Sequence, residues 1–138
     1  MKPKLKNVLA VIVGVVVGSI ANMTLVTIGP YVIPTPEGVD VTDVDSIKAS
    51  MHLFEFRHFI FPFLAHALGT LVGAYLAARI AASCRLAVAM VVGGFFLIGG
   101  IANTFMIGGP VLFSVVDLVG AYIPMAWIGA RLTGRNYP

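Results

Sequence analysis

The sequence predicts an all-α integral membrane protein: a four-helix bundle built from two duplicated helical hairpins, with a short amphipathic helix in the loop between the first two spans. Composition is the first reason. Apolar residues make up 59% of the chain and charged residues 11%, whereas soluble domains carry roughly 45–50% and about 25%. The mean hydropathy of +0.98 agrees with this. We expect a single membrane domain over residues 1–138.

The second reason is that the apolar residues fall in four blocks. The expected spans are residues 7–28, 59–78, 86–107 and 111–130, each close to the roughly 20 residues that a helix needs to cross about 30 Å of hydrocarbon. The basic and then apolar start of the chain also resembles a cleavable secretory signal. We favour an uncleaved span, because the apolar run continues to Ile28 and the segment has a repeat partner in the third span.

The third reason is an internal repeat. Gly-Ser-Ile-Ala-Asn at residues 18–22 returns as Gly-Gly-Ile-Ala-Asn at 99–103, and Leu-Val-Gly-Ala-Tyr occurs at both 71–75 and 118–122. The two phrases keep the same order in both halves. Repeated phrases at a fixed spacing indicate a repeated structural unit, so the sequence predicts two copies of one helical hairpin.

Charge predicts the orientation. Most of the nine basic residues lie at the N-terminus, between the second and third spans, and at the C-terminus: Lys2, Lys4, Lys6, Arg79, Arg85, Arg131 and Arg135. The loop at residues 31–58 is acidic instead. Basic loops stay in the cytoplasm, so we expect both termini to be cytoplasmic and this loop to lie outside. The net charge of +3 is explained by topology, and no nucleic-acid partner is inferred.

The outer loop, residues 31–58, is expected to contain one short helix. Prolines at 34 and 36 favour extended backbone before it. Thr42 and Asp45 then approximate a capping box. Apolar residues recur at helical spacing from Val44 to Phe54. The pattern predicts an amphipathic helix over residues 43–54 that lies on the outer membrane surface.

The sequence gives little support for a metal site or for a functional cysteine. His52, Glu55 and His58 are spaced by threes in the outer loop, and a carboxylate and histidine at this spacing occur in some helical metal sites. Such sites need further carboxylates from other helices, which the spans do not supply, so no metal is expected. The single cysteine, Cys84, excludes an internal disulfide and a cysteine cluster. No cofactor is implied.

Small residues at a spacing of four predict close helix packing. Gly14 and Gly18 lie on one face of the first span, and Gly69, Gly73 and Ala77 on one face of the second. In lipid, such faces let two helix backbones approach closely.

Polar residues gather at one depth in the spans. Asn22 and Asn103 lie shortly before the outer ends of spans one and three, and His66 and Asp117 lie as far past the outer ends of spans two and four. At a rise of 1.5 Å per residue, all four lie about 10 Å below the outer surface. We therefore expect four helices to bring polar groups to one level.

Asp117 is the leading candidate for a functional residue. An ionised carboxylate at mid-span costs about 2.5–3.5 kcal/mol and usually faces a protein interior or a cavity with a partner. His66 is the expected partner by depth, and Thr70 aligns with Asp117 in the repeat. Pro124 is expected to open the helix near Gly120, one turn away. The same set could instead only fix the register of the helices, at a gain of about 0.6 kcal/mol per hydrogen bond.

Two stretches, Phe63–Thr70 and Ala121–Trp127, resemble small four-span proteins of the bacterial inner membrane. The resemblance implies this topology and this membrane, and it implies no reaction. Small multidrug-resistance exporters have a similar size, but their defining glutamate in the first span has no counterpart, since residues 7–29 contain no acidic residue.

Three functions follow as hypotheses. The leading one is a transporter-like or channel-like protein, a homo-oligomer, for a proton, a cation or a small polar solute, with a binding site at Asp117, His66, Asn22, Asn103 and Thr70. The alternative is a non-catalytic accessory or scaffold protein that docks to a membrane-protein partner through its acidic outer loop. The third is an enzyme with His66 as base and Asp117 as its orienting group; it is the least supported, because no nucleophile or nucleotide motif accompanies them.

Overall fold

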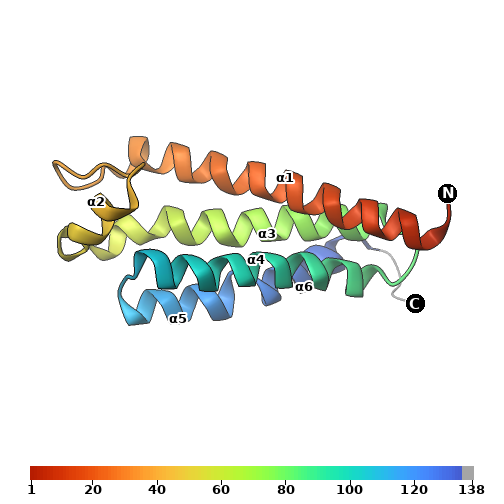
Figure 1. Cartoon of the computed structure of the whole chain (residues 1–138). Coiled ribbons are helices and arrows are strands. Elements are labelled where there is room, and N and C mark those ends of the chain that lie inside the picture. Colours follow the sequence, from red (N-terminus) through yellow and green to blue (C-terminus); the bar gives the residue numbers. More distant parts are fainter. Residues whose placement is uncertain (135–138) are drawn as a thin grey trace.

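The computed structural model describes residues 1–134, which contain helices and no strand. The elements are α1 (Pro3–Val32), α2 (Val44–Ala49), α3 (Ile60–Ile80), α4 (Arg85–Ile107), α5 (Val111–Gly120) and α6 (Ile123–Leu132), with 3₁₀ turns η1 (Met51–Leu53) and η2 (Phe56–Phe59) (Figure 1). Four segments are long and apolar enough to cross a membrane: Pro3–Val32, Phe56–Ile80, Arg85–Ile107 and Val111–Leu132. The prediction of an all-helical chain with four segments long and apolar enough to span a membrane is confirmed for the described residues.

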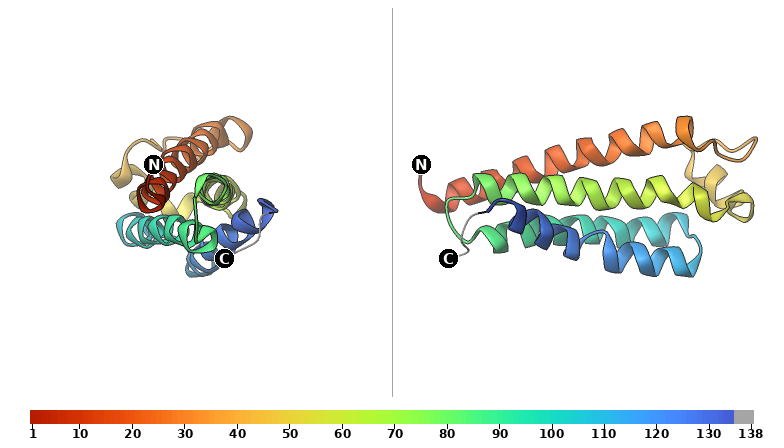
Figure 2. Two further views of the ribbon diagram at one scale, coloured as in Figure 1. Left: turned by 90° about the vertical axis from the view of Figure 1, so that its right-hand side faces the viewer. Right: turned by 180° about the vertical axis from the view of Figure 1, so that it is seen from behind.

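The bundle is elongated and antiparallel. The start of α1, the α3–α4 turn and the end of α6 lie at one end, here called the turn end, and the segment from 33 to 59 and the α4–α5 turn lie at the other, the loop end (Figures 1 and 2). Helix α3 is central and packs against α1, α4 and α6. At the turn end, the Asn7 side-chain oxygen accepts from the Ala82 N–H at 2.9 Å and its amide donates to the Ser83 carbonyl at 3.1 Å.

Helices α1 and α3 are in backbone contact, as the small residues predict. A Cβ added to Gly14 would lie 2.6 Å from the Gly73 carbonyl oxygen, and one added to Gly69 would lie 2.8 Å from the Asn22 Cβ. Only glycine permits this approach at those positions. Toward the loop end, α1 leans away from α4 (Figure 2).

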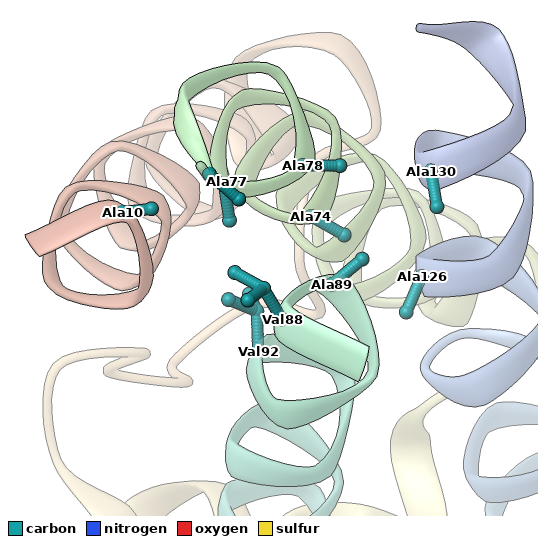
Figure 3. Close-up of a cluster of buried hydrophobic side chains, with 10 residues drawn as sticks. Ala10, Ala74, Ala77, Ala78, Val88, Ala89, Val92, Ala126 and Ala130 are labelled. Atoms are coloured by element: carbon teal, nitrogen blue, oxygen red, sulfur yellow. The ribbon is translucent and has the colours of Figure 1, made fainter. Parts of the chain in front are cut away.

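The turn-end half of the bundle is filled with small apolar side chains. Its core cluster is fully or almost fully buried (Figure 3) and consists of Ala10, Ala74, Ala77, Ala78, Ala81, Val88, Ala89, Val92, Ala126 and Ala130. Such short side chains permit tight helix packing in lipid, where association depends on van der Waals contact. This half of the bundle is therefore closely packed.

The fourth span is two helices and not the single helix over 111–130 that hydropathy predicts. Helix α5 ends at Gly120 and α6 begins at Ile123, with Pro124 in its first turn. The repeated phrase lies within unbroken α3 at 71–75 but spans the break at 118–122. The residue of α3 that aligns with Pro124 in the repeat is Ala77. Pro124 therefore accounts for the break in the fourth span, because proline lacks the N–H that would continue the helix. The origin of the hairpins by duplication stays a prediction.

The outer-loop helix is shorter than the sequence predicts. Helix α2 covers only Val44–Ala49, and the chain then turns separately at η1. Asp43, not Thr42, is the N-cap, since its carboxylate accepts from the Asp45 N–H at 3.0 Å. The expected capping box is wrong, because the Thr42 hydroxyl donates instead to Asp40 at 2.6 Å.

Candidate functional site

His66 of α3 and Asp117 of α5 are in direct contact, as their depths predict. The His66 Nδ1 lies 2.8 Å from one carboxylate oxygen of Asp117 and 2.9 Å from the other. Asp117 is 2% exposed, whereas the His66 side chain is 17% exposed. The carboxylate is thus enclosed in the bundle, and the imidazole stands between it and the nearest open space.

Tyr122 completes this cluster, and the sequence reasoning missed it. Its hydroxyl donates to Asp117 Oδ2 at 3.0 Å, and its ring stacks 5.7 Å from the His66 ring. In a continuous helix, residues five apart lie about 140° apart around the axis, so this contact depends on the break between α5 and α6. The sequence signal that could have found Tyr122 is its place at the end of the repeated phrase, close to Pro124.

The contacts assign the proton on His66. An ionised carboxylate only accepts hydrogen bonds, and Asp117 accepts one from Tyr122. The His66 Nδ1 is therefore the donor to Asp117, by inference from the hydrogen-bond network. This leaves Nε2 to accept a hydrogen bond when the ring is neutral, or to donate one when it is charged.

His66 lines a cavity of about 380 Å³ at the loop end. Asn22 of α1 and Asn103 of α4 line the same cavity. Most of the remaining lining is apolar or aromatic, including Met23, Met51, Phe54, Phe59, Phe61 and Phe113. Aspartate, glutamate, lysine and arginine are missing from the described lining. The volume is that of a site for a small organic molecule.

The five predicted site residues do not all meet. Asn22, His66 and Asn103 line the cavity, and Asp117 lies behind His66 without lining it. The Asn22 Oδ1 is buried and has no hydrogen-bond partner in the described structure, whereas Asn103 is exposed. Thr70 is fully buried, lies outside the cavity lining, and its hydroxyl also has no partner among the described residues.

The histidines and the glutamate of the outer loop do not form a metal site, and His58 also lines the cavity. The Glu55 N–H donates to His58 Nδ1 at 2.8 Å in a capping box of η2, and the Glu55 carboxylate pairs with Arg57 at 3.0 Å. His52 lies on the separate turn η1 and is exposed. The chain is extended at Phe54 and Glu55, so the three do not share one helix. Within residues 1–134, no three side chains of metal-ligating type come together. Cys84 is free and exposed.

Comparison with known proteins gives no match, whether against family models, curated proteins or solved structures.

Proposed function

We propose that this chain is a small solute-binding protein of the bacterial inner membrane, transporter-like in type, with its loop end outside and both termini cytoplasmic. The observation that carries the proposal is the position of His66. One ring nitrogen is held by a buried carboxylate, and the ring forms part of the wall of a cavity. A bound solute is contacted there by Nε2, Asn22 and Asn103.

The cluster is suited to holding a solute by a hydrogen bond. Asp117 binds one ring nitrogen of His66 and Tyr122 stacks on the ring, so the ring orientation is fixed. A solute hydroxyl or amine then donates a hydrogen bond to Nε2 of the neutral ring, and no proton is transferred.

The packing favours a carrier over an open channel. The turn-end core below the His66 level is made of buried alanine and valine side chains (Figure 3). A solute in the cavity therefore reaches the other side only if helices move. The glycines on the facing sides of α1 and α3 are used within the chain. We therefore propose a homo-oligomer whose subunit contacts do not involve these glycines.

Thiol labelling tests the proposal. In a Cys84→Ser background, single cysteines replace Asn103, which lines the cavity, and Asp117, which does not. The probe is N-ethylmaleimide, a small uncharged reagent, added to right-side-out vesicles. We expect position 103 to react, position 117 to be protected, and short-chain alcohols, amines or carboxylic acids to slow the reaction at 103. In proteoliposomes, compounds that protect should be taken up with wild type and not with His66→Gln.

Failure at both steps rejects the proposal. If no compound protects position 103 and none is taken up, solute binding is rejected and the accessory-protein alternative gains. That alternative relies on the exposed carboxylates of the loop, such as Asp43 and Asp45. It predicts that Asp43→Asn with Asp45→Asn releases a co-purifying partner, while His66→Gln does not.

A further inference from the structure

The polar atoms of the cavity select the head group of the solute. The Asn22 Oδ1 is a buried acceptor without a partner among the described residues. His66 has Nδ1 bound to Asp117, so its neutral ring offers Nε2 to the cavity as a second acceptor. A solute hydroxyl has one proton and so donates to one of these two acceptors. Leaving a buried acceptor unpaired is unfavourable, so a head group without a donor binds less well.

The lining also argues against a charged head group. Its described residues include no carboxylate, lysine or arginine, and Asp117 has its oxygens taken by His66 and Tyr122. A permanently charged ligand would enter this apolar space without a partner, at high cost. A neutral hydroxyl donates to one of these acceptors without that cost.

Apart from Thr35 and His58, the rest of the cavity lining is apolar or aromatic and favours an apolar body. Phe54, Phe59, Phe61 and Phe113 line it together with methionines of α1 and η1, and Phe59 and Phe113 are in ring contact at 4.7 Å. These side chains gain from excluding water around a hydrocarbon chain or ring. The cavity therefore has an apolar body and a small accepting end, which is the shape of a site for an amphiphile.

The exposed lining residues show where the cavity opens. Met23 and Val26 of α1 are 56% and 40% exposed, and Asn103 of α4 is also exposed. They line the cavity on α1 and α4, the two helices that diverge toward the loop end (Figure 2). Both helices are apolar enough to span a membrane, so this opening faces the lipid chains. From the loop side, Ile47, Met51 and Phe54 are partly buried and cover the cavity.

We infer that the ligand of the cavity is a neutral, membrane-dissolved amphiphile with a hydroxyl head, which enters sideways from the bilayer between α1 and α4 and donates to His66 or Asn22. The inference rests on the proposed function and names the class of its solute. A lipid alcohol of the leaflet and a hydrophobic alcohol that first dissolves in it share this chemistry.

Photolabelling tests the head group without any variant. The probe is a long-chain alcohol with a diazirine in its chain, compared in proteoliposomes with its methyl ether and with the carboxylic acid of equal length. We expect the alcohol to label cavity-lining residues about fivefold more than the ether, the effect of one hydrogen bond. Equal labelling by the alcohol and the ether would overturn the head-group assignment, as would preferred labelling by the acid.

Three tryptophan variants test the route. Val26→Trp obstructs the opening between α1 and α4, Val41→Trp obstructs the loop side, and both positions line the cavity at nearly equal exposure, 40% and 41%. Val16→Trp is the off-cavity control on α1, also exposed. We expect Val26→Trp alone to slow labelling by the alcohol, by several-fold. If Val41→Trp slows it and Val26→Trp does not, the sideways route is wrong and the ligand comes from water.

The two proposals fail separately. If the alcohol does not label the cavity while water-soluble compounds still protect a cysteine at position 103, the amphiphile is excluded and solute binding stands. If Asn103→Cys is also never protected, solute binding itself is rejected.

Discussion

The Tyr122 hydroxyl occupies the space that a side chain on Gly100 would need. A Cβ built on Gly100 would overlap the hydroxyl and clash with the ring carbons beside it. Helix α4 thus makes room for the tyrosine that binds Asp117 beside His66. The absence of a side chain at one position of α4 therefore determines the geometry of a cluster formed by α3, α5 and the break between α5 and α6.

Gly100→Ala is expected to destabilise the protein by about 1–3 kcal/mol, the usual cost of overpacking, because the Tyr122 ring must move away from Asp117. Gly99→Ala is the matched control: its Cβ would meet nothing within 4 Å. Unfolding in detergent, followed by circular dichroism, measures both. Equal midpoints for the two variants would contradict the tight fit of Tyr122 against α4.

Removing Asp117 is expected to cost more than removing the hydroxyl that binds it. Tyr122→Phe deletes one hydrogen bond, worth about 0.6–1.7 kcal/mol between membrane helices. Asp117→Ala leaves both the His66 Nδ1–H and the Tyr122 hydroxyl without their acceptor, and breaking a buried pair costs about 3–5 kcal/mol. The same unfolding measurement ranks the variants. A smaller loss for Asp117→Ala than for Tyr122→Phe would show that the carboxylate is not the centre of the cluster.

The spans and the His66–Asp117 contact could be predicted because both follow from local signals. Hydropathy gives the length of a span, and counting from its end gives the depth of a polar residue. Tyr122 could not be placed, since its contact depends on how two half-helices are set around the break at Pro124. The cavity also escaped prediction, because it forms only where α1 leans away from α4 and the loop folds back over the space.

The prediction of a single helix in the loop failed for a related reason. Apolar spacing from Val44 to Phe54 predicts one helix on a flat membrane surface. Ile47, Met51 and Phe54 instead line the cavity, and the chain turns at Ser50 between α2 and η1. A periodic pattern shows which residues are buried together, and it does not show whether the buried surface is lipid or a concave part of the protein.

Asp40 gives a pH-dependent prediction for the loop. The Thr42 hydroxyl and then the Thr42 N–H donate to its carboxylate and hold the pKa of Asp40 below its usual value. A lowered carboxyl pKa stabilises the folded loop above the usual aspartate range, and this contribution is lost as pH falls through the lowered value. Thr42→Ala should raise the pKa of Asp40 toward normal, and Thr42→Ser should leave it low. An NMR titration of the Asp40 carboxyl carbon measures this pKa in both variants. Equal pKa values in the two variants would exclude the Thr42 hydroxyl as the cause.

Gly14 and Gly94 are expected to respond to alanine in opposite directions, although both lie inside spanning helices. At Gly94 a Cβ meets nothing within 4 Å, so alanine should stabilise by up to about 1 kcal/mol through helix propensity. At Gly14 a Cβ would lie 2.6 Å from the Gly73 carbonyl oxygen and 2.9 Å from the Ala77 Cβ. Backbone cannot yield as a flexible side chain does, so α1 must shift, and we expect a loss of about 1–3 kcal/mol.

A shift of α1 also alters the cavity wall at Asn22, on the same helix. Gly14→Ala should therefore change the maleimide reactivity of a cysteine at position 103, whereas Gly94→Ala should not. Stabilisation by both substitutions would mean that α1 and α3 are not held in backbone contact.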